Sequence, residues 1–233
     1  MRIAIISDIH SNLPALEEVL GKIVELKADA TYCLGDIVGY GPFPNECVEL
    51  IRTKCVTAVK GNHDSGLLGE TPTEHFNRYG QAAIEWTKDK ITSQGLEYLR
   101  SLQIQVVDRG ITFVHSSPHK PAEWTYLMSS NQAKKNFSSF STPLCFIGHT
   151  HVPVVIGDDS SMNKFVFGKR FIINVGSVGQ PRDGNPESAF GLLDTKERSY
   201  RLVRVPYDIS KTAQAIEDAG LPAFLGRRLF QGI

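Results

Sequence analysis

Seven side chains that can bind a metal ion lie at or just beyond the ends of short apolar runs in this sequence. They are Asp8, His10, Asp36, Asn62, His115, His149 and His151. The members of the D-x-H and H-T-H pairs are two residues apart, so on an extended segment both side chains of a pair point to the same side. The set offers carboxylate, imidazole and amide ligands but no thiolate, which favours Mn, Fe, Co, Ni or Zn over Cu(I) or iron–sulfur chemistry.

A single histidine is more often a surface or core residue than a metal ligand. The occurrence of several potential ligands after neighbouring apolar runs is what favours metal binding here. Seven ligands exceed what one tetrahedral ion needs, whereas they suit two ions if one carboxylate bridges them. Asp36 follows the middle one of three apolar runs and is the natural bridge. Two ions about 3.5–4 Å apart can clamp a phosphoryl group and activate a bridging water. The residues therefore predict a two-metal centre.

The segments that must position these side chains alternate between strand-like and helical patterns in the first 60 residues. Residues 12–26 have apolar side chains at helical spacing, with Asn12 as an N-cap and Pro14 in the first turn. This alternation predicts a parallel sheet, and ligands bind beyond the carboxyl ends of the strands in such sheets. We expect the strands at 2–6, 30–34 and 55–60, and the helices at 12–26 and 44–52.

The rest of the chain has a different pattern. Helices are expected within 70–102, a strand hairpin at 104–115, loop and helix at 116–142, a strand at 144–148, and terminal helices at 208–229 with a break at Gly220 and Pro222. Short runs at 152–156, 164–167, 170–175, 189–194 and 200–205 predict a second, largely antiparallel sheet. No linker divides the sequence, so we expect one domain over 1–233, with 65–143 as helical and loop insertions that shape the pocket and 208–233 as C-terminal helices.

Five motifs occur in order between residues 8 and 151. They are D-x-H from Asp8, G-D ending at Asp36, G-N-H-D around Asn62, the strand-terminal His115, and G-H-T-H ending at His151. This ordered set resembles the calcineurin-like metallophosphoesterases. The segment INVGSVGQPRDGNPESAFGLLD, residues 173–194, is similar to the small bacterial and archaeal phosphoesterases of that superfamily, the phosphodiesterase-type group.

The resemblance implies an α/β fold of four layers, α/β/β/α, in which a parallel or mixed sheet packs on the second sheet. It implies two divalent ions, with Mn²⁺ preferred among Mn, Fe, Zn, Ni, Co and Mg. It also implies that metal-bound hydroxide attacks the phosphorus of a phosphodiester or small phosphomonoester while His63, as the general acid, protonates the leaving oxygen. The implied ligands are Asp8, His10 and His151 for the first ion, Asn62, His115 and His149 for the second, and Asp36 as the bridge.

The sequence departs from the Ser/Thr protein phosphatases of this superfamily at two positions. Gly39 stands where those enzymes have an Asp that orients the catalytic histidine, and Gly41 stands where they have a phosphate-binding Arg. Protein-phosphatase activity is therefore not expected, and small phosphodiesters are expected to react at least as well as monoesters. Asp64 either orients His63 or bonds the backbone as a turn residue.

Three further residues are candidates for contact with the substrate, and they are Tyr40, Ser177 and Arg182. Arg182 could grip a phosphate or form a structural ion pair. Trp124 and Tyr126 could stack on a nucleobase from a lid, or pack in the core or against a second subunit. His75 and His119 are expected on the surface unless they line the pocket, and the pair Arg227-Arg228 is expected to be solvated.

Charge and composition limit the partners. Lys and Arg together equal Asp and Glu together at 25 each, so the net charge is zero, which argues against long nucleic acid and an anionic membrane. We expect no signal peptide, and the sequence has no apolar run of about 20 residues and no CxxC pair among its four cysteines. A cytoplasmic protein with a small phosphate-ester substrate is therefore expected.

Two rival functions remain beside this prediction. A nuclease or nucleotide phosphodiesterase would use the same centre. A non-catalytic metal-binding scaffold of the same fold is the other, but the retromer subunit of this kind lacks the catalytic histidine, whereas His63 is present here.

Overall fold

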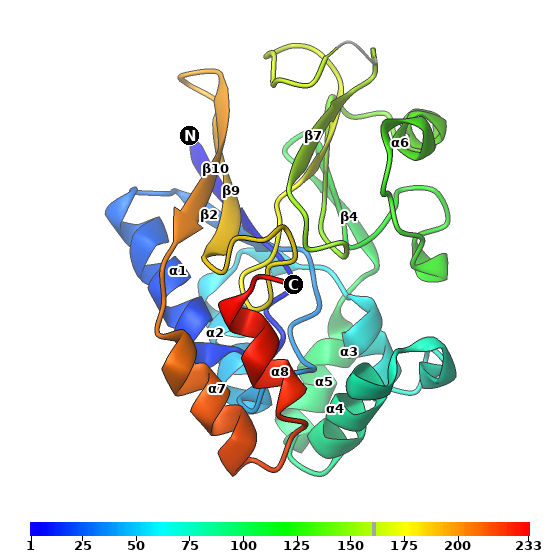
Figure 1. Ribbon diagram of the computed structural model, residues 1–233. Helices are drawn as coiled ribbons and strands as arrows, with labels where there is room; N and C mark the ends of the chain where they lie inside the picture. The colour runs from blue at the N-terminus through cyan, green and yellow to red at the C-terminus, as the bar shows by residue number, and fades with distance from the viewer. Residues whose placement is uncertain (160–161) are drawn as a thin grey trace.

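The computed structural model describes residues 1–159 and 162–233, in which two five-stranded sheets pack between helices (Figure 1). The first sheet has the strand order β10-β9-β1-β2-β3. Strands β1, β2 and β3 run parallel, and β9 and β10 add to the other edge of β1 in antiparallel pairing. The bounds are Arg2–Ile6 for β1, Ala30–Cys33 for β2, Thr57–Ala58 for β3, Ser188–Asp194 for β9 and Ser199–Val205 for β10.

The second sheet has the strand order β4-β5-β6-β8-β7. Its three central strands β5, β6 and β8 run parallel, while β4 and β7 are antiparallel edge strands. The sheet is therefore mixed rather than largely antiparallel. The bounds are Gln105–Asp108 for β4, Ile111–Val114 for β5, Leu144–Ile147 for β6, Val154–Gly157 for β7 and Phe171–Asn174 for β8.

Two details of the predicted strand pattern are corrected by the structure. The runs at 189–194 and 200–205 join the first sheet rather than the second, and residues 164–167 form no strand. The hairpin expected at 104–115 is confirmed as the antiparallel pair β4 and β5, so the segment 65–143 contributes two strands to the second sheet besides its helices and loops. Apolar alternation indicates that a strand forms, but the edge it joins depends on packing across the whole fold.

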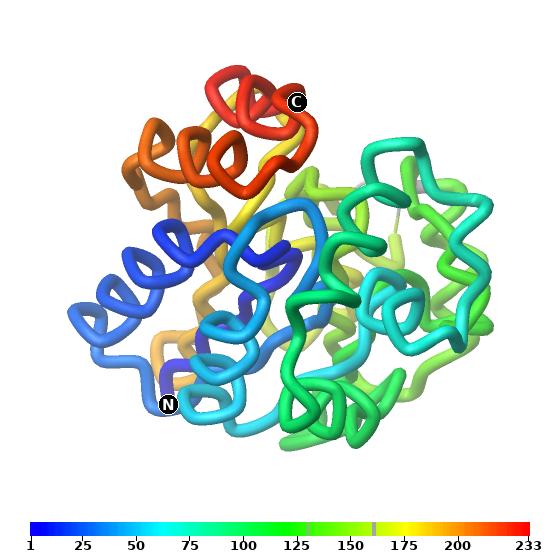
Figure 2. The backbone as a smooth tube through the Cα atoms, turned by 90° about the horizontal axis from the view of Figure 1, so that it is seen from below, coloured from blue at the N-terminus to red at the C-terminus, as the bar shows by residue number. Residues whose placement is uncertain are grey.

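Helices cover the outer faces of both sheets. The first helix begins as predicted, because the Asn12 side chain accepts a hydrogen bond from the backbone N–H of Ala15. Figure 2 shows α7 beside this helix, which it contacts, and α8 beside α7. Within the described residues, no helix has both the length and the apolar character needed to cross a bilayer. The α-helices are α1 Leu13–Glu25, α2 Pro44–Lys54, α3 Asn62–Leu67, α4 Arg78–Lys88, α5 Ser93–Ser101, α6 Ser130–Asn136, α7 Ile209–Asp218 and α8 Phe224–Arg227.

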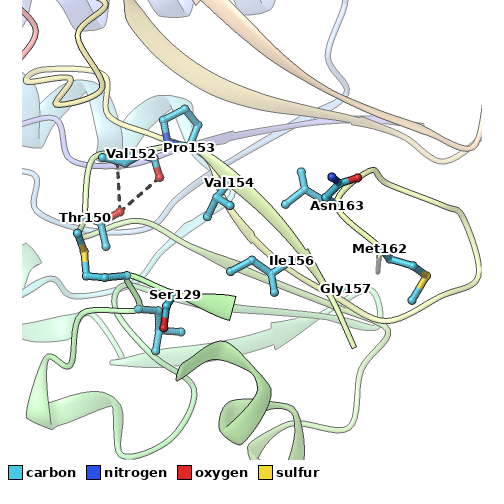
Figure 3. Close-up of a pocket in the computed structure, with 12 residues that line it drawn as sticks. Ser129, Thr150, Val152, Pro153, Val154, Ile156, Gly157, Met162 and Asn163 are labelled. Atoms are coloured by element: carbon cyan, nitrogen blue, oxygen red, sulfur yellow. Dashed lines mark hydrogen bonds between the residues drawn. The ribbon is translucent and has the colours of Figure 1, made fainter. Parts of the chain in front are cut away.

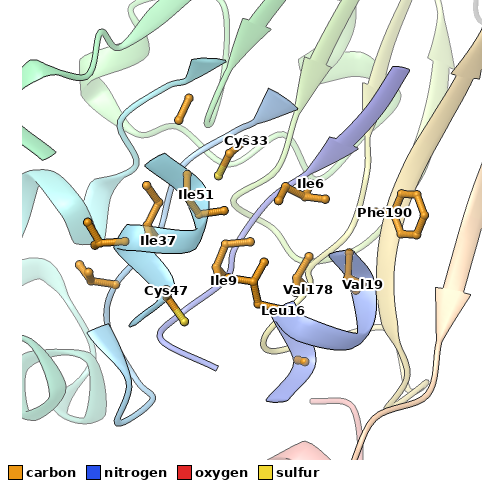
Figure 4. Packing of buried hydrophobic residues seen from close by; sticks show 14 of the residues in the cluster. Ile6, Ile9, Leu16, Val19, Cys33, Ile37, Cys47, Ile51, Val178 and Phe190 are labelled. Carbon is orange, nitrogen blue, oxygen red and sulfur yellow. The ribbon is translucent and has the colours of Figure 1, made fainter. Parts of the chain in front are cut away.

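Apolar packing confirms the four-layer arrangement. Between the two sheets, the ring of Tyr32 on β2 stacks on Phe113 of β5, with centroids 4.2 Å apart and planes 5° from parallel. On the outer face of the first sheet, side chains such as Ile6 and Phe190 pack against α1 and α2 (Figure 4). The outer face of the second sheet packs on Phe137, just beyond α6. The carboxyl ends of β1, β2, β3, β5 and β6 consequently meet in one region, where the candidate ligands follow them.

Candidate metal centre

The first group of candidate ligands consists of Asp8, His10 and His151, all buried. The Nε2 atom of His151 lies 3.2 Å from Oδ1 of Asp8 and 3.1 Å from Nε2 of His10. The Nε2 atom of His10 lies 3.9 Å from the same Asp8 oxygen. Ligand atoms from residues near the start of the chain and from His151, which is 141 positions beyond His10, therefore face one point.

The second group consists of Asn62, His115 and His149. The Nε2 atom of His115 lies 3.1 Å from Oδ1 of Asn62 and 3.2 Å from Nδ1 of His149. Asp36 lies between the two groups, because its Oδ2 atom is 3.6 Å from Nε2 of His10 and 3.3 Å from Nε2 of His115. One carboxylate oxygen thus contacts both groups, which is the arrangement that a bridging ligand requires.

Each ligand histidine has its outer ring nitrogen held by a backbone carbonyl. The pairs are His10 Nδ1 with Val38, His115 Nδ1 with Leu34, His151 Nδ1 with Gln180, and His149 Nε2 with Trp124. A carbonyl oxygen only accepts hydrogen bonds, so each of these outer nitrogens carries the hydrogen. The inner nitrogen of each ring then faces the centre, as is typical of histidines that bind metals.

The chemistry of the first group fits a bound cation. Burial lowers the pKa of His10 well below its ordinary value and also lowers the pKa of His151, so both rings are neutral at pH 7. Their inner nitrogens then present two lone pairs 3.1 Å apart, which repel each other unless a positive ion lies beside them. The Oδ1 atom of Asp8 is buried and has no hydrogen-bond partner among the described residues. A divalent ion would satisfy all three atoms.

The remaining ligands differ in their protonation. Burial lowers the pKa of His149 to about 3. Burial alone would raise the pKa of the Asp36 carboxyl, but the neighbouring His115 and His63 outweigh it and hold that pKa well below the usual range. Burial alone would lower the pKa of His115, but the carboxylates of Asp36 and Asp8 outweigh it and raise this pKa to about 9. Among the candidate ligand histidines, His115 is therefore the one that would have to lose a proton to bind a metal ion at neutral pH.

Five of the seven candidate ligands adopt left-handed backbone conformations, with φ between 50° and 67°. They are Asp8, Asp36, His10, His149 and His151. Asp and His enter this region more readily than most residues, and clusters of such conformations mark functional sites. The side chains of Asp8 and His10 therefore point to the same side because the backbone turns sharply at both residues. The sequence predicted an extended segment at this place instead. The turns are held because the backbone N–H groups of Asp8 and His10 donate to the carbonyls of Gly35 and Asp36.

His63 follows Asn62 in the first turn of α3 and lies outside both ligand groups. Its ring packs against Tyr40 and Phe76, with centroids 4.6 and 4.8 Å away. A ring nitrogen of His63 also lies within 4.8 Å of ligand atoms of His10 and Asp36, so distance alone does not separate a ligand from an acid. Its Nδ1 atom has no hydrogen-bond partner among the described residues, and burial lowers its pKa to about 4.

Asp64 bonds the backbone and does not orient His63. Its Oδ1 atom accepts hydrogen bonds from the backbone N–H groups of Ile37 and Val38, at 2.9 and 3.2 Å, and Oδ2 accepts one from Gly61 at 2.9 Å. The buried carboxylate therefore ties the G-N-H-D turn to the loop that follows β2. This resolves the alternative that the sequence left open.

A cleft of about 320 Å³ opens beside His63 and the second ligand group. Trp124 and Tyr126 line it, as does the exposed His75, so both aromatic residues face the site rather than the core. Trp124 is anchored twice, because its indole N–H donates to Oγ1 of Thr71 at 2.9 Å and its carbonyl accepts from His149 at 2.9 Å.

A larger cavity of about 410 Å³ lies between β7 and residues 127–129 (Figure 3). Its lining is mostly apolar and includes Thr150, which stands between the ligands His149 and His151 in the sequence. The hydroxyl of Thr150 is bonded to the backbone of Val152. None of the described residues that line this cavity has a titratable side chain, whereas His63 and His149 line the smaller cleft.

The three predicted substrate contacts have different placements. Tyr40 lines the cleft, and the Arg182 guanidinium lies 5.8 Å from the centre of its ring. Arg182 bonds Gln180, has no carboxylate partner among the described residues, and its charge lowers the pKa of His63 and His151. Ser177 is the exception, because its fully buried hydroxyl bonds the carbonyl of Asp8 and the N–H of Gln180. Its position is structural rather than open to a substrate.

Arg228 is a second cation near the site that sequence reasoning misses. Its side chain is partly buried rather than solvated, and its pKa falls to about 10 through burial and the nearby charge of Arg182. The preceding Arg227 is exposed, as predicted for the pair. No local pattern distinguishes the two residues, because only the docking of the C-terminal helices brings Arg228 towards Arg182.

Comparison with known proteins agrees with this geometry. Residues 1–198 match the calcineurin-like phosphoesterase superfamily domain, and the chain therefore belongs to that superfamily. Membership places it among enzymes that hydrolyse phosphoric esters, with His and Asp clusters suited to metal ions.

Several relatives share most of the chain. The uncharacterized protein MJ0912 of Methanocaldococcus jannaschii is 42% identical over 99% of this chain and 98% of its own length. A metallophosphoesterase from Sphaerobacter thermophilus has a crystal structure that matches with a TM-score of 0.89 at 41% identity, covering 100% of this chain and 99% of that chain. Phosphodiesterase YfcE of Escherichia coli is 28% identical over 83% of this chain and 88% of its own.

Proposed function

We propose that the chain is a dinuclear metal-dependent phosphodiesterase. The observation that carries this proposal is the position of Asp36, whose Oδ2 atom lies 3.6 Å from His10 and 3.3 Å from His115. In this proposal Asp8, His10 and His151 hold one ion, Asn62, His115 and His149 hold the other, and Asp36 bridges them. The oxygen and nitrogen donor set suits Mn, Fe, Co, Ni or Zn, and we propose Mn²⁺ among these on the ground of superfamily membership.

Two bound ions would polarise the phosphoryl oxygens and activate the attacking water. The protein itself supplies the proton for the leaving group. His63 borders the cleft and the ligand Asn62, so its imidazole can reach an ester oxygen on that side. A bound phosphate brings negative charge towards His63 and raises its pKa from the value of about 4, which favours the protonated form that a general acid needs.

The substrate preference follows from the space around Gly41. A Cβ atom added there would lie 2.6 Å from the carbonyl oxygens of both His10 and Ser11, so the loop has no room for the Arg of the protein phosphatases. A monoester carries a second negative charge that such a cation would offset, whereas a diester carries one. Arg182 is a cation near the site that could contact a phosphate oxygen instead. Diesters are therefore expected to react at least as well as monoesters.

Two substitutions test the metal and acid roles separately. Asp36→Ala should lose both ions, because the bridging carboxylate is removed. His63→Ala should keep both ions and lower kcat by roughly 10²–10⁴, the usual effect of removing a general acid. Metal analysis of each purified variant after reconstitution with Mn²⁺ gives the stoichiometry. Loss of metal from His63→Ala would reverse the assignment, and full metal loading without any turnover in the wild type would favour a scaffold.

The substrate preference has its own test. The kcat/KM for bis(p-nitrophenyl) phosphate is compared with that for p-nitrophenyl phosphate at matched pH and metal. A preference of roughly tenfold or more for the monoester, about 1.4 kcal/mol in the transition state, would defeat the diesterase assignment and leave the two-metal centre intact. If Arg182→Ala then removed that preference, Arg182 would be identified as the cation that binds the second charge.

A further inference from the structure

The walls of the 320 Å³ cleft are unusually aromatic for a site that binds a phosphate. Four aromatic rings line it, and they belong to Tyr40, Phe76, Trp124 and Tyr126. They come from the loops after β2, before α4 and after β5. The same cleft is bordered by Asn62, His63 and His149. The leaving group of an ester, if it departs on the side of His63, therefore lies in a cleft with aromatic walls.

Tyr126 is the ring most available to a ligand. Tyr40 and Phe76 both pack against His63 and form its wall. Tyr126 stacks on His149, with centroids 4.0 Å apart and planes 24° from parallel, yet 47% of its surface is exposed. Its hydroxyl makes no hydrogen bond within the described residues. An exposed ring fixed beside the reaction centre is the feature that stacking on a planar aromatic ligand requires.

The loop that carries Tyr126 is held in place before any ligand binds. Trp124 has φ of 52°, an uncommon conformation for a bulky residue, and both its indole N–H and its carbonyl are bonded. Such a conformation persists where surrounding contacts determine it. Because the loop is ordered in advance, stacking on Tyr126 does not have to offset the entropy of closing a lid.

The polar groups of the cleft favour a neutral ligand over an anionic one. Glu123 also lines the cleft, but its carboxylate is paired with Lys120 at 2.8 Å, while Asn77 and His75 add an amide and an imidazole. Hydroxyls and ring nitrogens of a ligand could bond Asn77 and His75, and no Lys or Arg among the described lining residues attracts a second phosphate. The volume lies near the lower end of the range for small-molecule sites, which suits one nucleoside and not a longer strand.

We propose that the cleft binds the nucleobase and sugar of a nucleoside phosphodiester, with the base stacked on the exposed face of Tyr126. This inference rests on the proposed phosphodiesterase function and specifies its substrate class. The stack puts the sugar between Tyr126 and His63, so the ester oxygen of the nucleoside is the oxygen that leaves. An aliphatic diester lacks the stacking group and binds more weakly.

The test isolates the base by comparing two ligands with the same phosphate. Adenosine 5′-monophosphate and ribose 5-phosphate are measured as competitive inhibitors of bis(p-nitrophenyl) phosphate hydrolysis by the Mn²⁺-loaded protein. Base–aromatic stacking should make the nucleotide bind roughly 5- to 150-fold more tightly. Tyr126→Leu should remove most of this ratio, while Tyr126→Phe should retain the ratio.

Phe167→Leu is the matched control, because Phe167 is also 47% exposed but does not line the cleft. It should leave both affinities unchanged. Equal affinities for the two ligands in the wild type, or an unchanged ratio in Tyr126→Leu, would overturn this inference while hydrolysis of bis(p-nitrophenyl) phosphate still supported the proposed function. Absence of that hydrolysis in the Mn²⁺-loaded wild type would overturn the proposed function and this inference together.

Discussion

Gly39→Ala offers a direct test of the role of His63 without changing any candidate ligand. Gly39 has φ of 94°, and a Cβ atom added there would lie 2.5 Å from Nδ1 and 3.1 Å from Cγ of the His63 ring. Ordinary contact begins at 3.4 Å, so the imidazole must move by about 0.9 Å to admit the methyl group. The substitution therefore displaces the proposed acid from the position that the fold gives it.

The expected size of the effect follows from this displacement. A misplacement of about 1 Å can lower a catalysed rate by roughly 10²-fold, so kcat should fall by about that factor while the metal content stays unchanged. The left-handed φ adds a backbone cost of about 1–2 kcal/mol. For a chain of this length that cost lowers the Tm by roughly 2–8 °C.

Gly110→Ala separates the backbone cost from the displacement. Gly110 has φ of 72° in the turn between β4 and β5, and no atom lies within 4 Å of an added Cβ. This variant should lose similar stability and keep the wild-type kcat. The assay is hydrolysis of bis(p-nitrophenyl) phosphate by metal-loaded protein at a temperature well below both Tm values.

The double variant decides whether Gly39 acts through His63. Once His63→Ala has removed the ring, the methyl group of Ala at position 39 has room, so adding Gly39→Ala should lower kcat no further. An additional loss of about 10²-fold in the double variant would show that Gly39 acts elsewhere. A wild-type kcat in Gly39→Ala would refute the proposed placement of the acid.

Three further predictions concern the groups around the centre. Asp64→Asn should lower the free energy of unfolding by roughly 1–3 kcal/mol, because an amide cannot accept from all three backbone N–H groups, and an unchanged Tm would contradict this. Metal binding at pH 7.5 should release about one proton from His115, whose pKa is about 9, and the release should fade above pH 9; calorimetry in buffers of different ionisation enthalpy measures it. Because that pKa lies above 6.5, the proton on His115 stabilises the metal-free fold below pH 6.5, and this stabilisation is lost as the pH rises through about 9. Thr71→Val in a Trp86→Phe background should shift the emission of Trp124 to longer wavelength, because the indole N–H loses its buried partner; an identical spectrum would show that the tether does not hold the loop.

The grouping of the candidate ligands could be predicted for two reasons. Each side chain's chemistry depends on its residue type alone, and the order of the strands decides which side chains become neighbours. Parallel strands end at one edge of a sheet, so residues that follow β1 and β2 must be neighbours whatever the details of packing. The ordered motifs then indicated which residues to group. The helix start at Asn12 was equally predictable, because a cap depends only on residues within one turn.

Other features depended on contacts between segments far apart in the sequence. The strand pattern did not show that β9 would pair with β1 and β10 with β9, because alternation is the same for either sheet. The buried position of Ser177 and the approach of Arg228 to Arg182 likewise arise from docking of the last third of the chain. These pairings and placements were predicted wrongly or not at all, because the residues adjacent in the sequence carry no information about such distant contacts.

The sequence by itself thus determined the donor types, their order and the sheet edge where they gather, since these follow from side-chain chemistry and strand alternation. Only the tertiary structure decided how the donors face one another. It turns Asp8 and His10 inward through left-handed backbone, and it places the Trp124 carbonyl on the outer nitrogen of His149. Hydrogen bonds between loops impose these geometries, and such bonds form only when the two sheets have packed and the loops at their ends lie within reach of each other.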